Sequence, residues 1–426
     1  MRVKVILMLS LLPLTGTGII VAQTIGKSDT ISLSLNDAEA LFLKNNFFLL
    51  AAKYQVSEAD AAVIQAKLWD NPVFSLDKEA YNVPSGKWFI IPNGEYAMSL
   101  QQLIYLAGKK NKRVEIEKIN SRIAQFQFYD LIRTLRYELR TTFFDLYFSQ
   151  KSIKIYDMEI SALKTLTGAY AEEYRKGNIP FRELARLQAL QFSLENEKIG
   201  LLKNLNENQR NLTLLTGDTL FRIVRPVLNI STLDSIQSSS IDLGTLLDDG
   251  IKNRYDLKIS ESQVQAEELN LALQKSLRVP DMTVGATYDR VGGYIPDYNS
   301  LSLSFNLPLW NFNQGNIKIS KNRIEEKKVL MSQKEMEVRT DITNAFVQFL
   351  ETEKLYKSSL QKFDTNYDRL FDGITEGYKN HTISLLEFID YYETFKNSKT
   401  EYYQLQVNRL EALENLSMAT GTSIFK

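Results

Sequence analysis

The chain has 426 residues, of which 44% are hydrophobic and 24% charged, and its 51 basic residues balance its 51 acidic residues. This composition excludes a disordered chain and a bundle of membrane helices, and the zero net charge gives no electrostatic reason to expect nucleic acid as a partner. Cysteine is absent, which excludes disulfides, thiolate metal sites, cysteine nucleophiles and a lipidated N-terminal cysteine. Because the chain has one histidine and no phosphate-loop or metal-ligand motif, we expect neither an enzyme nor a cofactor.

Residues 1–22 have the pattern of a secretory signal peptide. Arg2 and Lys4 precede an apolar run over 5–14, and small residues follow up to Ala22. An N-terminal membrane anchor is the alternative, but the run is short and contains Pro13. No other segment approaches the ~20 apolar residues that a spanning helix needs. We therefore expect an exported protein whose membrane contact is made by something other than a helix.

Two long stretches of the chain align without a gap, one from Glu172 and the other from Glu376. The matched landmarks are Tyr174 with Tyr378, Ile179 with Ile383, Asn211 with Asn415, Thr216-Gly217 with Thr420-Gly421, and Phe221 with Phe425. Earlier, "LKNNFFLLAAKYQVSEAD" from Leu43 aligns with "IKNRYDLKISESQVQAEE" from Ile251. Chance similarity between helices is the alternative, but the order of the landmarks predicts an internal repeat. The first repeat is 23–221, the polar connector is 222–240 and the second repeat is 241–426.

Each half has the same predicted order of elements: a helix, two short alternating strands, and a hairpin of two long helices. In the first half these are about 35–69, 73–81, 96–106, and the hairpin 109–216 with helices 109–176 and 181–216. In the second half they are about 243–277, 282–290, 299–309, and the hairpin 316–419 with helices 316–380 and 384–419. Prolines follow the first helices, and the long helices carry apolar residues at three- and four-residue spacing, which is typical of a coiled-coil seam.

The stretch "LSLSFNLPL" at 301–309 alternates strictly between apolar and other residues, as a strand with two different faces does. About ten tilted residues cross a bilayer, and Ser302, Ser304 and Asn306 would then face water. Aromatic residues that suit interfacial girdles flank the strands: Trp88, Phe89, Trp310 and Phe312. An ordinary soluble sheet packed on helices is the alternative. Since four strands cannot close a membrane barrel, we expect them to be shared among identical chains.

With this order of elements the chain resembles the TolC family of outer-membrane efflux proteins. "LPLWNFNQGNI" resembles the strand-to-helix junction of the branch that includes the cobalt–zinc–cadmium resistance (heavy-metal efflux) outer-membrane proteins, and "YRKGNI" and "YKNHTI" resemble the family's helical turns. The resemblance covers essentially the whole mature chain. It implies a homotrimer in which a 12-stranded membrane β-barrel continues into a periplasmic α-helical barrel.

The resemblance also implies function and partners. The protein would be the outer-membrane channel of a tripartite efflux system, conducting substrates passively from an inner-membrane pump of the resistance-nodulation-division type and a periplasmic adaptor (membrane fusion) protein. Divalent metal ions are one candidate cargo, and the sequence does not identify the substrate. The alternative is a soluble periplasmic or surface coiled-coil structural or adhesion protein.

By the same resemblance, the hairpin turns form the entrance. Glu387 and Asp390 fall where relatives carry carboxylates that narrow and charge it, and Glu183 is the counterpart of Glu387 in the first half. Rings of carboxylates in a trimer favour cations; the alternative is a solvated helix face whose acids suit the helix dipole.

The residues expected to dock the adaptor are the hairpin tips: Gly177, Asn178, Asn380, His381 and Thr382. His381 stands where the first hairpin has Gly177, so the two tips differ. Three His381 side chains near the axis would suit a metal-sensing site, and an exposed loop histidine is the alternative. The basic segment "GKKNKR" at 108–113 lacks the Walker spacing and is interpreted as a membrane-proximal anchoring cluster.

Overall fold

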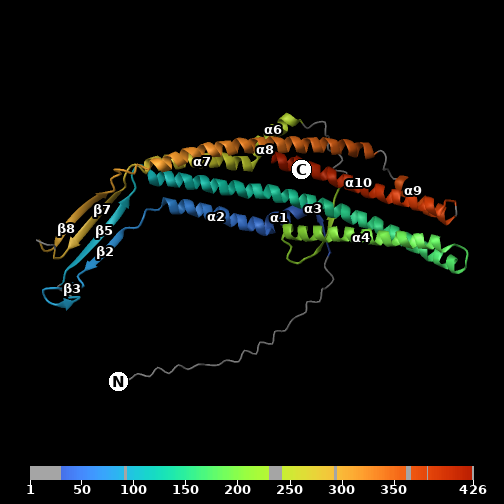
Figure 1. The fold of residues 1–426 in the computed structure, drawn as a ribbon, viewed down its shortest axis with the longest axis horizontal. Helices are drawn as coiled ribbons and strands as arrows, with labels where there is room; N and C mark the ends of the chain where they lie inside the picture. The colour runs from blue at the N-terminus through green and yellow to red at the C-terminus, as the bar shows by residue number, and fades with distance from the viewer. Residues whose placement is uncertain are drawn as a thin grey trace, which may run out of the picture.

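The computed structural model describes residues 30–90, 94–229, 242–291, 295–360, 366–380 and 382–424. The predicted signal peptide lies outside these residues. The molecule is long and thin (Figure 1): a sheet lies at one end, and helices run from it to two hairpins at the other. The described chain is therefore mainly helical with a small sheet part, as the sequence predicts.

The elements follow one another in a similar order along the two halves of the chain. Those up to the end of the first hairpin are β1 (Thr30–Ser34), α1 (Leu35–Asn45), α2 (Phe47–Lys67), β2 (Val73–Lys78), β3 (Tyr81–Asn82), β4 (Lys87–Trp88), β5 (Tyr96–Ile104), α3 (Lys109–Arg175) and α4 (Phe181–Thr216). The remaining elements are β6 (Ile223–Val227), α6 (Leu243–Asn253), α7 (Tyr255–Ser276), β7 (Met282–Asp289), β8 (Tyr298–Phe305), α8 (Gln314–Leu360), α9 (Asn366–Lys379) and α10 (Leu385–Thr420). The predicted helix 316–380 covers α8 and α9, and 361–365 lie outside the described residues.

Several features differ from the sequence-based expectation, among them the short strands β1, β3 and β4, which the sequence analysis does not predict. Each predicted first helix consists of two helices, which meet at Asn46 and at Arg254 in extended backbone with φ near −61° and −63°. The segment 222–240, assigned to a polar connector, begins with β6, which pairs in parallel with β1. Val224 and Pro226 of β6 are buried, and a five-residue strand that contains a proline carries too weak a pattern to be recognised from sequence.

Asn46 and Arg254 make the same kind of contact in the two halves. The Asn46 Nδ2 donates to the carbonyl oxygen of Leu215, at the end of α4, over 2.9 Å. The Arg254 Nη1 donates to the carbonyl oxygen of Ala419, at the end of α10, over 3.1 Å. Both side chains are buried, so each helix break is fixed by a polar link to the end of a return helix.

The two return helices end at glycines in the left-handed region, Gly217 with φ 64° and Gly421 with φ 68°. Glycine alone adopts this backbone at little cost. A Cβ on Gly217 would also lie 2.5 Å from the carbonyl oxygen of Asn45. The Thr-Gly pairs that the sequence alignment matched therefore sit directly against the helix breaks.

Two hydrophobic cores hold the helices together. The larger core lies where α1, α3, α4, α6, α8 and α10 meet and includes Phe42, Phe143 and Phe349. The smaller core lies near the hairpin tips and includes Leu187 from α4 and Phe388 from α10. The second core joins the two hairpins to each other close to their ends.

The four long strands form one sheet in the order β2-β5-β7-β8, and all neighbours are antiparallel. The adjoining helices keep this order, since α2 packs on α3, α3 on α7 and α7 on α8. Among the described residues, none of the helices has an apolar stretch long enough to cross a membrane.

We expect Asn46→Ala to lower the free energy of unfolding by about 2 kcal/mol, because it removes the cap of α2 and leaves the Leu215 carbonyl without its donor. Thermal unfolding of the purified protein, followed by circular dichroism, measures the effect. Asn196→Ala, at an exposed position of α4, is the matched control and should change stability by less than about 0.5 kcal/mol. Equal effects of the two substitutions would contradict the assigned role of Asn46.

Candidate functional site

The register of the four-stranded sheet separates its side chains into two chemically different faces. One face is mainly apolar and carries Phe74, Leu76, Met98, Leu100, Ile104, Met282, Val284, Ala286, Leu301, Leu303 and Phe305. Polar groups on this face are Lys78, Tyr96, Gln102, Tyr288 and Asn299. The other face is mainly small or polar and carries Ser75, Asp77, Ser99, Gln101, Thr283, Gly285, Thr287, Asp289, Ser300, Ser302 and Ser304. Apolar or aromatic groups on this face are Val73, Ala97, Leu103 and Tyr298. The alternation of apolar and polar side chains that the sequence shows at 301–309 therefore extends across all four strands.

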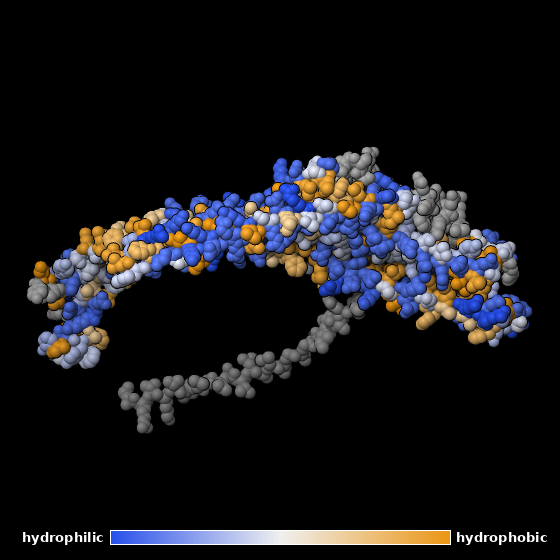
Figure 2. All heavy atoms as spheres, turned by 45° about the horizontal axis from the view of Figure 1, so that its top comes forward, coloured by the Kyte–Doolittle hydropathy of each residue, from blue (hydrophilic) through white to orange (hydrophobic). Residues whose placement is uncertain are grey.

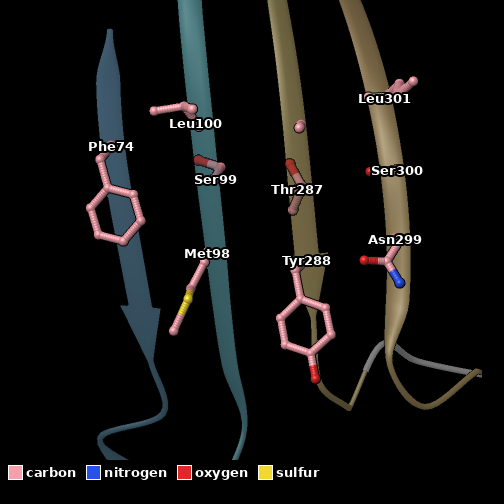
Figure 3. A pocket seen from close by; sticks show the side chains of 10 residues that line it. Phe74, Met98, Ser99, Leu100, Thr287, Tyr288, Asn299, Ser300 and Leu301 are labelled. Carbon is pink, nitrogen blue, oxygen red and sulfur yellow. The ribbon is translucent and has the colours of Figure 1, made fainter.

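The apolar face is not covered by any other described part of the chain. Leu301 is 87% exposed, and Phe74 and Leu100 are exposed as well. Figure 3 shows these side chains across the four neighbouring strands, around a shallow hollow of about 390 Å³. A continuous apolar surface of this kind is typical of contact with lipid or with another chain.

Both edges of this sheet are open within the described chain. The outer sides of β2 and β8 have no strand partner among the described residues. The helices that adjoin the edge strands also expose large apolar side chains: Phe47, Tyr54 and Ile64 on α2, and Val329, Met336 and Leu355 on α8. Figure 2 shows hydrophobic side chains scattered along the body and near the tips. The open strand edges and the exposed apolar side chains of these two helices together favour a neighbouring chain on each side.

β8 ends at Phe305, four residues before the predicted end at 309. Pro308 has no N–H to donate to a ladder, and the Leu309 N–H bonds to the Leu307 carbonyl instead. The expected strand continuation is therefore a turn that leads toward α8.

The junction between sheet and helices is built around Lys109, which is 2% exposed. Its Nζ lies 2.7 Å from the Asp281 carboxylate and donates to the Val279 carbonyl over 2.6 Å. The Leu106 N–H also donates to Asp281. Lys109 thus joins the first half of the chain to the second, and is not part of an exposed basic cluster.

The neighbouring cations of the segment 108–113 contact aromatic rings. Lys110 Nζ lies 3.9 Å from the centre of the Trp69 ring, and the Arg113 guanidinium lies 4.8 Å from that of Tyr105. Tyr105 also donates to Asp70 over 2.6 Å. Cations and aromatic rings therefore lie together at the end of the sheet where the helices begin, and the anchoring role stays a prediction.

The first hairpin tip reverses at Gly177, whose φ of 79° favours glycine. Asn178 closes the turn, because its backbone N–H donates to the Glu173 carbonyl and its Nδ2 donates to the Glu173 carboxylate over 2.6 Å. Hydrogen bonds from Asn178 and Lys176 lower the pKa of Glu173. Gly177 and Asn178 are both exposed.

The second hairpin tip keeps the backbone hydrogen bonds that the first tip makes at the aligned positions. The Asn380 N–H donates to the Glu376 carbonyl, and Thr382 donates to the Gly377 carbonyl through both its N–H and its hydroxyl. His381 lies outside the described residues, so its predicted role stays a prediction. Asn380 and Thr382 are exposed.

Glu387 and Asp390 lie on the exposed side of α10, opposite the buried Phe388. The Ser384 N–H donates to the Glu387 carboxylate over 2.8 Å, and the Glu387 N–H bonds back to the Ser384 hydroxyl. These bonds from Ser384 lower the pKa of Glu387. Glu387 is therefore ionised and closes a capping box at the start of α10, and its place in a carboxylate ring stays a prediction.

Glu183 lies half-buried in the first turn of α4. Burial, the Tyr170 hydroxyl and the Glu183 charge together raise the pKa of Tyr378 in α9. Glu183 thus lies close to the other hairpin, whereas Glu387 and Asp390 face away from the helices of their own chain.

Comparison with known proteins shows the fold and a family to which part of the chain is similar. Residues 40–218 match the family model described as outer membrane efflux protein. The Campylobacter jejuni outer membrane channel CmeC is similar over 92% of this chain and 87% of that chain, with a TM-score of 0.75 and 16% identity. The chain is thus similar to the outer membrane efflux proteins over 40–218, and its fold agrees with that of a solved outer-membrane channel.

Other relatives agree with this family. The cobalt-zinc-cadmium resistance protein CzcC of Cupriavidus metallidurans is 18% identical over 392 residues, which is 91% of this chain and 90% of that protein. The solved structure of CusC is similar over 91% of this chain and 92% of the CusC chain, with a TM-score of 0.73 and 16% identity. The chain is an outer-membrane channel protein and not an enzyme, as these relatives are. The soluble or adhesion alternative is thereby set aside.

Single cysteines along 300–305 test the two faces, because the parent chain has no cysteine. We expect Ser300→Cys, Ser302→Cys and Ser304→Cys to react in cells with a hydrophilic, membrane-impermeant maleimide, since they share the polar face. Leu301→Cys and Leu303→Cys should react several-fold more slowly, because lipid would cover them. Reaction rates without a two-residue period would contradict the assigned faces.

Proposed function

We propose that three copies of this chain close a 12-stranded barrel in the outer membrane, continuous with a helical tunnel in the periplasm. The observation that carries the proposal is the sheet with one apolar face, one polar face and two open edges. In lipid each unpaired edge group would cost several kcal/mol. Pairing β8 of one copy with β2 of the next removes both edges when the ring closes.

The helices support the same head-to-tail arrangement. α2 and α8 lie at opposite edges of the helical layer and expose the apolar side chains named above. If β8 meets β2 of a neighbour, α8 meets α2 of that neighbour and both stripes are buried. A heterologous contact that repeats by rotation gives a closed ring.

We also propose that the two halves are structural repeats. The buried contacts from Asn46 to Leu215 and from Arg254 to Ala419 occupy aligned positions in the two sequences, and each lies beside a Thr-Gly helix end. Three copies then supply six pairs of helices around the tunnel.

The proposed entrance is where the hairpin tips converge. Glu387 and Asp390 are exposed and lie on one helix face, so three copies would give two carboxylate rings. Glu183 lies nearby on α4 at the matched point of the first hairpin. The exposed tip residues Gly177, Asn178, Asn380 and Thr382, together with His381, are the proposed docking surface for a periplasmic adaptor, and an inner-membrane pump of the resistance-nodulation-division type would complete the exporter.

The cargo that we propose is divalent metal ions. CzcC is a cobalt-zinc-cadmium resistance protein, and carboxylate rings favour cations. Growth of a deletion strain in zinc, cobalt or cadmium salts, compared with growth in apolar drugs, tests the cargo. Sensitivity confined to the drugs would refute a metal cargo without affecting the proposed trimer.

The mature protein should be a trimer in mild detergent, because monomers would leave both sheet edges and both apolar helix stripes unpaired. Native mass spectrometry measures the number of copies. A stable monomer that still carries its detergent-bound sheet would refute the shared barrel.

Neutralising the proposed rings with Glu387→Gln and Asp390→Asn should lower the cation-to-anion permeability ratio of single channels in planar bilayers by several-fold. It should also weaken block by divalent cations added from the tip side. Glu387→Gln keeps an oxygen for the Ser384 N–H, so the cap is retained. Glu376→Gln, exposed on α9, serves as a control for a general change in surface charge. An unchanged ratio in the double variant would leave these acids as solvated helix residues.

A further inference from the structure

A carboxyl group is buried in the smaller core without a partner that could stabilise its charge. Glu159 of α3 is 1% exposed. Neither of its carboxyl oxygens has a hydrogen-bond partner among the described residues. Neither the channel wall nor the proposed entrance uses this group, and leaving an ionised carboxylate in such a place is costly.

The groups that face Glu159 come from all three helices packed there. Lys396 and Tyr392 project from α10, Glu197 from α4 and Tyr156 from α3 itself. The Lys396 Nζ lies 2.7 Å from Glu197 Oε2, and the Tyr156 hydroxyl donates to the same oxygen over 3.0 Å. Lys396, the one cation among these groups, is thus already paired with Glu197 of α4.

The Lys396–Glu197 pair connects the two hairpins. Glu197 lies on α4 of the first hairpin and Lys396 on α10 of the second. Burial disfavours the charge on Glu197, but the bonds from Lys396 and Tyr156 outweigh it and lower the pKa of Glu197. The bond between Glu197 and Lys396 ties α10 to the α3–α4 hairpin beside the smaller core.

We propose that Glu159 is a proton-operated switch: protonated, it lets α10 pack on the first hairpin, and on losing its proton it loosens that packing. The ionised form would lie beside the Glu197 carboxylate and compete with it for Lys396. It would also need water, which enters only if α10 moves away from α3. The functional consequence, an entrance that opens more readily in alkaline solution, rests on the proposed function of the tips.

The direction of the pH effect follows from proton binding. Burial is the main cause that raises the pKa of Glu159 to about 8, with Lys396 opposing it and Glu197 adding to it. The packed state therefore holds a proton that a hydrated, separated Glu159 releases above its ordinary pKa of 4.5. The equilibrium constant for separation should rise about tenfold per pH unit from pH 5 to 8 and level off above that.

Spin labels on α4 and α10 measure this separation directly and do not depend on channel activity. The labels are placed at Asn196→Cys and Asn397→Cys, both exposed, in full-length protein diluted with unlabelled copies and reconstituted in lipid. In the parent, the population with the longer interlabel distance should grow between pH 5 and 8. In Glu159→Gln, which mimics the protonated carboxyl, it should stay at the low-pH value.

The matched control is Glu195→Gln, a half-exposed position of α4, which should keep the response of the parent. A pH response in Glu159→Gln equal to that of the parent, or no response in the parent, would overturn the proposal and leave the proposed trimer and channel untouched. If Glu159→Gln fails to assemble, infrared titration of the parent decides. Loss of a protonated carboxyl absorption near pH 8 supports the switch, and absence of any such loss refutes it.

Discussion

The open edges of one amphipathic sheet are the constraint on which the rest of this structure depends. A four-stranded sheet with an exposed apolar face and unpaired outer strands is unstable both in water and in lipid. The order β2-β5-β7-β8 places the unpaired strands on opposite sides of the chain. The adjoining helices keep the same lateral order, so whatever neighbour completes the sheet also meets the apolar stripes of α2 and α8.

Buried polar contacts fix how the helices pack on one another beyond the sheet. Lys109 and Asp281 join the two halves where the strands end. Asn46 and Arg254 fix the helix breaks against the ends of the return helices, and Arg409 pairs with Glu353 inside the α8–α10 contact over 2.7 Å. Such groups are costly to bury without their partners, so each selects one alignment of helices whose apolar surfaces alone would permit several.

The hairpin ends combine a rigid core with charged, exposed turns. The Tyr170 and Tyr378 rings stack between the two hairpins with 5.6 Å between their centroids, and Tyr378 stacks on Phe388 within the second hairpin at 4.6 Å. Glu387 and Asp390 point away from this core. In the proposed entrance, these carboxylates would face passing ions, and the packing behind them would control how far the helices separate.

The sequence alone determined the order of elements, the four long strands, the return helices and the exposed tips. These follow from short-range patterns: alternation in "LSLSFNLPL", helical spacing in the hairpins, and turn residues such as Gly177. It failed at β6, at the two helix breaks and at Lys109, because a charged or amide side chain gives no local sign that it will be buried. Only the tertiary structure decided these, since Lys109 and Asp281 are 172 residues apart and Asn46 bonds a carbonyl 169 residues away. The same holds for Glu159, which looks like an ordinary acid of a helix until α4 and α10 close over it and remove the water that would stabilise its charge.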